Sequence, residues 1–353
     1  MRAEPLRTEL AAPPADDAGE PHLVELISAE IDQSGPITFA RFMERALYEP
    51  GLGYYATSRE RTTRSGDFLT APELHPIFGQ VVACQIGEMC ERLGNPARFT
   101  VREYGAGRRT LGQALTADTA YEPVEFASAK PVTPLTGVVL ANEFLDALPI
   151  HRLVYEGGAE PSELLVGWRD GQFVEEVGEI SDDRLIAWLE RHRIGLHAGD
   201  IVEVNLQMAD WLKQIGRDLE RGFVLILDYG SGDRDTVRAF RGQHVSSAVL
   251  GGVGHQDLTA DVDFDALEDE ARDAGFEVLG RVRQAEFLLN AGLDEVYAAA
   301  RETADQDWDS ALNLRAAVRR LLDSSGLGGF VVVILGKNVE REPPLSGLVK
   351  RAV

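Results

Sequence analysis

The chain has 353 residues, of which 44% are apolar and 26% are charged, and this composition is typical of a folded globular protein with a sizeable core. No apolar run approaches the roughly 18 residues that a membrane-spanning helix needs, so we expect no membrane partner. The net charge of −23 repels phosphate backbones and argues against nucleic acid as a partner. Such a surface suits a cationic substrate, although a solubility or high-salt adaptation of the host cell explains it as well.

The N-terminal segment and the two cysteines bear on the cellular compartment. The first 20 residues or so are rich in Pro, Ala and acids and lack the apolar stretch of a secretory signal. Cys84 and Cys90 lie six residues apart in a predicted helix, on faces too far apart to form a disulfide. With no disulfide framework and no cysteine-based metal site, we expect a reducing, cytoplasmic location.

In chain order, the first predicted element is an amphipathic helix over residues 37–47, capped by Thr38. Residues 47–73 form a long loop with three tyrosines, and a loop of this length in a compact domain is usually functional or disordered. Its aromatic residues argue against disorder. Apolar residues at helical spacing then predict a helix from Pro76 to about Leu93.

From residue 99 onward, predicted strands alternate with predicted helices, the pattern of a parallel, doubly wound α/β sheet. The predicted strands cover residues 99–105, 137–143, 201–205, 223–230, 276–282 and 329–336. A helix is expected to start at Thr110, and further helices cover Ser181–Arg193, Met208–Arg221, Asp263–Ala274 and about Ala311–Leu322. Polar–apolar alternation over residues 152–177 predicts a small antiparallel insertion.

These patterns predict four parts of the chain. They are a disordered lead-in over residues 1–22, a helical and substrate-loop region over 23–98, an α/β core over 99–340 with its insertion at about 150–180, and a tail over 341–353.

The first candidate site is the string from Glu103 to Leu111, which follows a predicted strand and opens a predicted helix. Gly105 and Gly107 allow the backbone to approach a bound group closely, and the helix N-terminus offers unpaired N–H donors. The carboxylate of Glu103 could accept hydrogen bonds from an ammonium group. An ordinary tight turn remains the alternative for this string on its own.

The second candidate site is the string from Ala141 to Pro149, at the carboxyl end of a predicted buried strand. Open α/β sheets bind ligands at that end. If the turn after the strand is helical, Glu143 and Asp146 share a face and could hold a guanidinium, with Asn142 beside them. The alternative is a capping arrangement before a helix that is blocked at Pro149.

The third candidate site lies in the long loop, where Asp67, Thr70 and Glu73 follow Tyr54 and Tyr55. Aromatic walls with acids suit an apolar stem that ends in a cation. A purely structural Ω-loop is the alternative.

Other strings complete the survey of motifs. Asp228-Tyr229-Gly230 ends a predicted strand, and Asp263 is well placed to cap the following helix. His255 lies near Asp257, but no second His or Cys cluster completes a metal site, and we predict no metal. The sequence contains neither a nucleophile elbow nor a P-loop, which excludes the corresponding hydrolase and nucleotide-binding classes.

Taken together, these strings resemble the MidA family, which includes a mitochondrial arginine methyltransferase that assists assembly of respiratory complex I. The matching strings, in family order, are FMERALYEPGLGYY, GDFLTAPELHPIFGQ, REYGAGRRTL, GVVLANEFLDALPIHRLVYEGG, LILDYG, GHQDLTADVDF and QAEFLLNAG. The resemblance implies a Rossmann-like class I methyltransferase sheet of seven strands, with helices on both faces. It also implies S-adenosylmethionine as cofactor and a protein arginine as methyl acceptor.

The resemblance carries over to individual residues. Glu103, Gly105 and Gly107 match the family's cofactor turn, where the bound group is the amino-acid end of the cofactor. Asn142, Glu143 and Asp146 match the string at the carboxyl edge of the sheet, for which we predict a catalytic role, Glu143 by analogy with other arginine methyltransferases. Asp67, Thr70 and Glu73 match the loop that covers the site, with Tyr54 and Tyr55 as predicted substrate contacts.

The sequence departs from the family pattern at the cofactor site. Arg109 replaces the last glycine of the turn, and its side chain either collides with the cofactor or points outward. Residues 115–137 are too few for the family's second strand, helix and third strand. Glu125, 22 residues after Glu103, is the candidate for the ribose-binding acid. Asp261 stands where the family usually has His.

Two functions therefore follow from the sequence. The first is a methyltransferase that transfers a methyl group to an arginine of a partner protein, such as a respiratory-complex subunit. The second is a family member that has lost cofactor binding and acts as an assembly or binding protein. A methyltransferase for a small metabolite is a more distant third. The sequence does not specify the oligomeric state.

Overall fold

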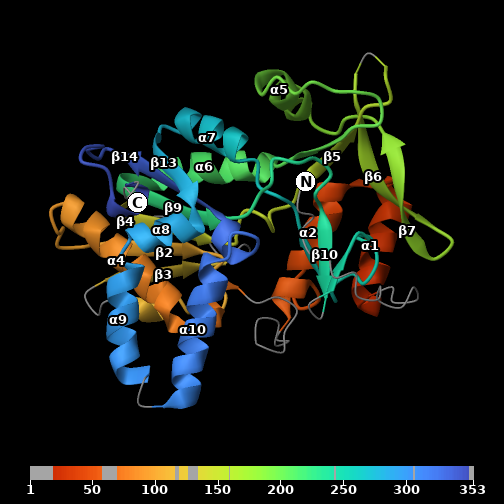
Figure 1. Cartoon of the computed structure of the whole chain (residues 1–353). Coiled ribbons are helices and arrows are strands. Elements are labelled where there is room, and N and C mark those ends of the chain that lie inside the picture. The colour runs from red at the N-terminus through yellow and green to blue at the C-terminus, as the bar shows by residue number, and fades with distance from the viewer. Residues whose placement is uncertain are drawn as a thin grey trace, which may run out of the picture. The chain divides into compact units, whose positions relative to one another are not determined.

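The computed structural model describes residues 19–57, 70–115, 119–125, 134–158, 160–241, 244–304 and 307–349 (Figure 1). The chain forms two compact units, each built from three separate segments. The first unit comprises Met1–Phe68, Asp146–Asp210 and Ser231–Ala266. The second unit comprises Leu69–Leu145, Trp211–Gly230 and Leu267–Val353. The four-part division expected from the sequence, with boundaries near residues 22, 98 and 340, remains a prediction.

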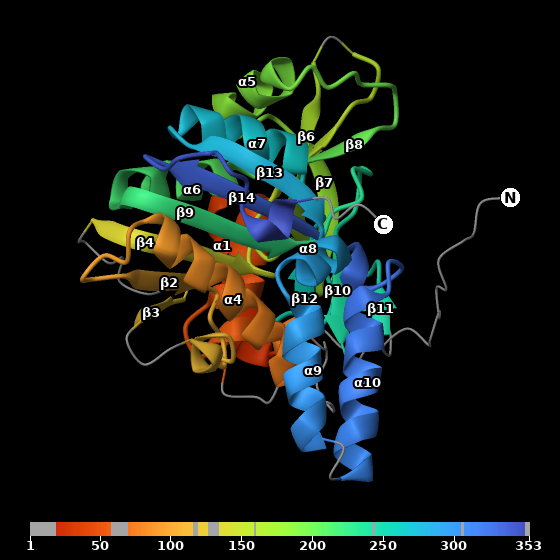
Figure 2. The same ribbon diagram turned by 60° about the vertical axis from the view of Figure 1, so that its left-hand side comes forward.

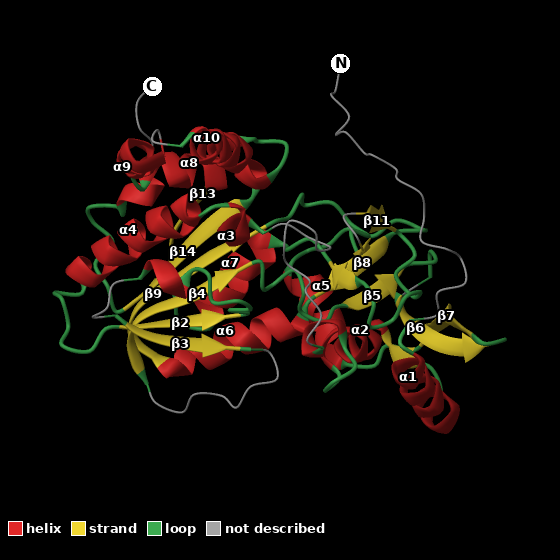
Figure 3. Cartoon of the chain, turned by 90° about the horizontal axis from the view of Figure 1, so that it is seen from below, coloured by secondary structure: helices red, strands yellow, loops and turns green. Residues whose placement is uncertain are grey.

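The second unit is built around a six-stranded sheet with the order β13-β14-β9-β4-β2-β3 (Figure 3). The strands are β2 (Thr100–Tyr104), β3 (Ala120–Val124), β4 (Leu135–Asn142), β9 (Leu219–Asp228), β13 (Glu277–Arg283) and β14 (Val331–Lys337). The first four are parallel to one another, whereas β14 is antiparallel to β9 and β13 antiparallel to β14. This is the expected Rossmann-like sheet.

The seven strands implied by the resemblance are not all present in the described residues. β3 forms the edge of the sheet, and β4 pairs directly with β2 on the other side. The segment between β3 and β4 has too few residues for a crossover helix and a further strand, as its length predicted. The sheet is therefore one strand shorter on the side of β3 among the residues that the structure describes.

Helices cover both faces of this sheet (Figures 2 and 3). They are α4 (Pro76–Arg92), α8 (Gln284–Asn290), α9 (Leu293–Ala304) and α10 (Trp308–Leu322) on one face, and α6 (Leu206–Asp218) and α7 (Phe264–Asp273) on the other. Alternate side chains of the strands, such as Val138 and Leu140 of β4, join one apolar cluster with α4, α8, α9 and α10. Two-residue periodicity in the strands thus divides the core between the two helical layers. None of the described helices has the length and apolarity that spanning a membrane requires.

Several predicted elements are confirmed and others need correction. The helix expected from Thr110 is only a 3-10 turn, η2 (Gly112–Ala114), in the described residues. The helix predicted to run to Arg221 ends at Asp218, since β9 begins at the next residue. No individual helix was predicted at the positions of α1 (Pro21–Ser34), α8 and α9.

The first unit contains the antiparallel strands that the sequence predicted over residues 152–177, and the strand predicted at residues 201–205 joins them instead of the parallel sheet. Its larger sheet has the order β1-β6-β5-β8, with β7 paired to β6, and a smaller sheet has the order β11-β10-β12. The strands are β1 (Ile37–Thr38), β5 (His151–Val154), β6 (Ser162–Arg169), β7 (Gln172–Gly178), β8 (Ile201–Val204), β10 (Arg238–Arg241), β11 (His244–Ser246) and β12 (Asp257–Thr259). Helices α1, α2 (Phe39–Tyr48) and α5 (Asp183–Arg191) complete this unit.

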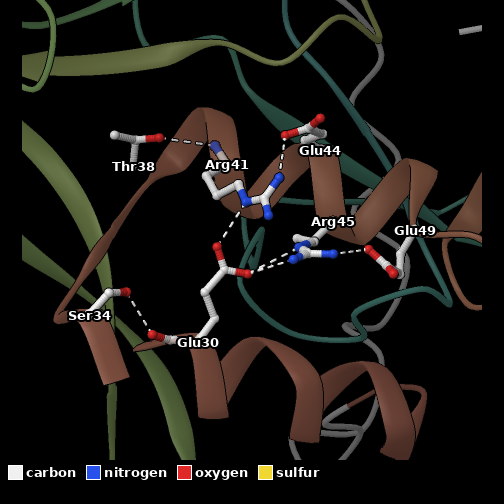
Figure 4. Close-up of polar contacts among 7 residues, drawn as sticks. All are labelled: Glu30, Ser34, Thr38, Arg41, Glu44, Arg45 and Glu49. Atoms are coloured by element: carbon white, nitrogen blue, oxygen red, sulfur yellow. Dashed lines mark hydrogen bonds and ion pairs between the residues drawn. The ribbon is translucent and has the colours of Figure 1, made fainter. Parts of the chain in front are cut away.

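An ion-pair network joins α1 to α2 in the first unit (Figure 4). The carboxylate of Glu30 accepts hydrogen bonds from Arg41 at 2.9 Å and from Arg45 at 3.1 Å. Burial raises the pKa of the Glu30 carboxyl, but the two arginines outweigh it and hold the pKa below its ordinary value. Thr38 caps α2 by accepting the N–H of Arg41, as predicted.

Candidate active site

The site lies in the second unit, where the direction of strand connection reverses. From β2 the chain passes to β3, its neighbour on one side in the sheet, and then to β4, its neighbour on the other side, and all three strands are parallel. Ligands of open α/β sheets bind at the carboxyl ends of the strands at such a switch point. The last paired residues of the three strands are Tyr104, Val124 and Ala141, so the residues that follow them line this edge together.

The turn after β2 has the open backbone that its glycines predicted. Gly105 has φ +65° and Gly107 has φ +48°, both in the left-handed region. The N–H of Gly105 donates to the carbonyl of Val124 at 2.9 Å, and the N–H of Gly107 donates to Oε1 of Glu125 at 3.0 Å. A Cβ at Gly105 would lie 3.0 Å from Cδ2 of Phe144, so the turn packs closely against the start of the neighbouring turn.

Arg109, which replaces the third glycine, also has a left-handed backbone, with φ +58°. Glycine adopts this conformation without cost, whereas another residue pays roughly 1–2 kcal/mol. The turn therefore keeps the geometry of a glycine-rich turn even though the last glycine is absent. The residue is exposed, which agrees with the outward-pointing alternative.

Glu103, the last acid of β2, is buried with 4% of its surface exposed. The hydroxyl of Tyr121 donates a short hydrogen bond to Oε2 of Glu103. Burial raises the pKa of the Glu103 carboxyl to about 7; the Tyr121 hydrogen bond opposes this shift and the charge of Glu125 adds to it. Tyr121 was not predicted as a site residue, because no motif includes it.

The turn after β4 is stabilised by hydrogen bonds to Asp228, the last residue of β9. Oδ2 of Asp228 accepts the N–H of Phe144 at 3.2 Å and of Leu145 at 2.9 Å, and Oδ1 accepts the N–H of Tyr229 at 2.9 Å. The side chain is fully buried. The sequence placed Asp228 at a strand end without giving it a role, and an acid that ends a buried apolar strand was the available signal.

Glu143 has a left-handed backbone with φ +49°, and no helix follows it in the described residues up to Ile150. The condition for placing Glu143 and Asp146 on one helical face is therefore not met. Oε1 of Glu143 accepts the N–H of Ala71 at 3.3 Å and the amide of Asn142 at 3.2 Å. These contacts fix the orientation of the Glu143 carboxylate.

The remaining predicted site residues occupy different positions. Thr70 precedes the short helix α3 (Ala71–Leu74), and Glu73 lies within it. Oε1 of Glu73 lies 3.9 Å from Nε of Arg108 in the cofactor turn. Asp67 lies outside the described residues. Asp146 belongs to the first unit, where it is buried and its carbonyl accepts the N–H of Ala260 at 2.9 Å.

Tyr54 and Tyr55 also belong to the first unit, in the 3-10 turn η1 (Tyr54–Ala56). Tyr54 is buried, whereas the ring of Tyr55 is 40% exposed and stacks on Tyr48 with 5.5 Å between the ring centroids. The hydroxyl of Tyr55 donates to Asp257 at 2.7 Å. Burial of this hydroxyl and the charge of Asp257 raise its pKa, so it remains a donor at neutral pH.

Two residues of the 254–264 string have structural contacts in the first unit. Asp261, which replaces the family's usual His, accepts the N–H of Ser231 at 2.6 Å, and its own N–H donates to Thr236. Asp263 accepts the N–H of Asp265 at 3.0 Å and of Ala266 at 2.9 Å, which confirms it as the cap of α7.

The residues at this edge fit a cofactor with a cationic amino-acid end and a ribose. Glu103 is a buried carboxylate, and among the described residues no Lys or Arg forms an ion pair with it. A Cβ at Gly107 would have no atom nearer than 4.0 Å, so this glycine leaves room for a close approach. Glu125 follows the last residue of β3, where a ribose acid is expected. The fold and this edge define a class I methyltransferase that uses S-adenosylmethionine.

Comparison with known proteins agrees with this class. The sequence model of a family described as "Putative S-adenosyl-L-methionine-dependent methyltransferase" matches residues 112–282. A protein from Burkholderia thailandensis, solved with S-adenosyl-homocysteine bound, superposes with a TM-score of 0.83 at 26% identity over 97% of this chain and 98% of its own.

Curated relatives from animals are also similar to this chain. The mitochondrial protein arginine methyltransferase NDUFAF7 of Homo sapiens is 28% identical over 80% of this chain and 75% of its own. The Drosophila melanogaster homolog is 28% identical over 81% and 78%. The chain is thus similar to S-adenosylmethionine-dependent methyltransferases over most of its length, in agreement with its resemblance to the MidA family.

The expected cytoplasmic location is contradicted by these relatives, which are named as mitochondrial proteins. Cys84 and Cys90 are free cysteines in the structure. More than one compartment is reducing, and this is why the cysteine argument could not identify the location.

Proposed function

We propose that this methyltransferase transfers its methyl group to an arginine side chain of a partner protein. The names of the animal relatives support the choice of arginine. The net charge of −23 supports a cationic substrate, because a negative surface attracts basic segments. A respiratory-complex subunit remains the prediction for the acceptor, on the family resemblance.

The observation that carries the proposal is the position of Glu143, one residue past β4 at the same edge as the cofactor turn. Its carboxylate is oriented by Ala71 and Asn142. A carboxylate held in this way can accept two parallel hydrogen bonds from a guanidinium and fix the plane of that group. When bound, the cofactor supplies a methyl group on a positively charged sulfur.

In this proposal the protein contributes orientation and electrostatics. Glu143 would hold one guanidinium nitrogen in line with the methyl group. On methylation this nitrogen would give up one proton, and Glu143 would stabilise the single positive charge that the guanidinium keeps. Asn142 keeps the Glu143 carboxylate in one rotamer through its amide donor. Asp146, Tyr54 and Tyr55 remain predictions as catalytic and substrate-binding residues.

The test uses methyl-labelled S-adenosylmethionine, the purified protein and an extract of cells that lack the gene. Labelled proteins are hydrolysed to amino acids, and we expect the label in methylarginine. Label in another amino acid, or only in small metabolites, would contradict an arginine acceptor.

Glu143→Gln tests the role of the carboxylate, and Glu91→Gln on the exposed side of α4 is the matched control. We expect the first change to lower kcat at least about 100-fold, with little effect on cofactor affinity, because the amide cannot accept both guanidinium bonds. Equal activity of the two variants would remove Glu143 from the mechanism. Absence of S-adenosylmethionine binding in the unaltered protein would instead favour the binding-protein alternative.

A further inference from the structure

We propose that Tyr121 is a positioning residue of the cofactor site: its hydroxyl holds the Glu103 carboxylate and favours its ionised form, and so determines the pH range in which the cofactor binds. The inference rests on the assignment of Glu103 to the amino group of the cofactor. It concerns a residue outside every motif of the sequence.

The sheet register places the two side chains on the same face. Tyr121 of β3 lies opposite Val101 of β2, and Glu103 follows Val101 by two residues, so all three side chains point to the face covered by α4. The side chain of Tyr121 is long enough for its hydroxyl to donate a hydrogen bond to Oε2 of Glu103, two positions further along the neighbouring strand.

The segment just after the cofactor turn makes room for the ring of Tyr121. A Cβ at Gly112 would lie 2.5 Å from Cζ of Tyr121, so the ring packs against a backbone that carries no side chain. Gly112 lies in η2, just after the turn that contains Gly105 and Gly107. The position of Tyr121 is therefore tied to the turn that receives the cofactor.

The charges around the pair explain why the hydrogen bond matters. Burial and the charge of Glu125 together raise the pKa of Glu103 to about 7, against the lowering effect of the Tyr121 hydrogen bond. The pKa of Tyr121 is raised by burial and by Glu103, while Arg109 acts in the opposite direction. In the described part of the chain no cation forms an ion pair with Glu103, so an arriving ammonium group supplies the missing positive charge.

It follows that cofactor binding ionises Glu103 and releases a proton below about pH 7. Without the Tyr121 hydroxyl the carboxylate loses the donor that stabilises its charged form, so a higher pH is needed for the same affinity. Losing a hydrogen bond to a charged group corresponds to about a tenfold change in affinity.

The test is calorimetric titration with S-adenosyl-homocysteine, which carries the same amino-acid end, from about pH 5.5 to about pH 8.5 in two buffers of different ionisation enthalpy. We expect the unaltered protein to bind more tightly as pH rises and to release a proton near neutrality. Tyr121→Phe should bind about tenfold more weakly near pH 7, with its pH midpoint moved upward. Tyr297→Phe, which removes a hydroxyl from α9, is the control and should change neither.

Gly112→Ala gives a second variant that retains the hydroxyl but displaces the ring, and we expect the same upward movement of the midpoint. Superimposable pH profiles for Tyr121→Phe and the unaltered protein would overturn the inference. Binding without pH dependence in the unaltered protein would overturn it while leaving the cofactor site in place. No binding at any pH would overturn the cofactor assignment as well.

Discussion

Two turns at the same edge of the sheet, one after β2 and one after β4, reach a similar shape in different ways. Both contain a residue other than glycine with a left-handed backbone, Arg109 in the first and Glu143 in the second. The first turn depends on two glycines: Gly105 lets Phe144 pack against the backbone, and Gly107 leaves the backbone uncovered by a side chain. The second turn is held by a single buried carboxylate, that of Asp228, which accepts backbone N–H groups beneath it.

The difference explains which substitutions each turn tolerates. The first turn has to let a bound group approach its backbone closely, so a side chain added at either glycine should weaken binding of that group. The second turn has to present Glu143 in one direction, so it depends on hydrogen bonds that a buried acid provides. Substitutions in the first turn should therefore affect cofactor affinity, and those in the second should affect stability and turnover.

The largest expected effect is that of Gly105→Val on the first turn. The new side chain meets Phe144 at 3.0 Å and has an unfavourable φ of +65°, so we expect cofactor affinity to fall at least about 100-fold. Gly94→Val has a comparable φ of +82° with no atom within 4 Å, and it should leave affinity unchanged. Calorimetry measures the cofactor affinity of both variants. Equal affinities would show that the turn is not part of the cofactor site.

The next effect is that of Asp228→Asn on the second turn. The amide replaces one acceptor by a donor that faces backbone N–H groups, which we expect to destabilise the fold by about 2–3 kcal/mol. Turnover should fall as well, because Glu143 loses its fixed position. Asp233→Asn, at an exposed position, is the control in urea denaturation, and similar midpoints for the two variants would contradict the account.

A third effect is the pH dependence of stability that comes from Glu103. Its pKa is about 7 in the folded protein against an ordinary value of 4.5, so the folded state holds the proton more tightly than the unfolded state. Stability of the cofactor-free protein should therefore fall as pH rises from about 4.5 to about 7 and level off above that. Glu103→Gln should remove this pH-dependent loss, and its free energy of unfolding at pH 8 should be about 1–3 kcal/mol higher than that of the unaltered protein. Urea denaturation at several pH values measures this pH dependence. If stability changed with pH in the same way for both proteins, Glu103 would not be its source.

The smallest effect is that of Arg109→Gly. Glycine relieves the left-handed strain at φ +58° but also adds freedom to the unfolded chain, so we expect a stability gain of no more than about 1 kcal/mol and no loss of cofactor affinity. Asn95→Gly should gain less, because asparagine tolerates a φ of +49° better. A large gain in cofactor affinity for Arg109→Gly would show that the arginine obstructs the site.

Much of the fold and part of the site could be predicted from the sequence. The buried strands, the cap at Thr38 and the glycine turn follow from local patterns, because each depends on neighbouring residues in the chain. The helix expected after the turn was reduced to η2, and the turn after β4 is not helical. Glu143 has a left-handed backbone, which keeps it out of a helical turn with Asp146, and side-chain spacing carries no signal for that conformation.

The sequence by itself determined the class of the sheet, the cofactor turn and the family resemblance, since these depend on hydrophobic period and on short strings of adjacent residues. Only the tertiary structure decided that Tyr121 supports Glu103 and that Asp228 holds the turn of Glu143. The hydrogen-bonded residues lie 18 and 84 positions apart in the chain, and they meet only when the strands pair in register. Contacts of this kind depend on how separate strands align, which the sequence of each strand alone does not specify.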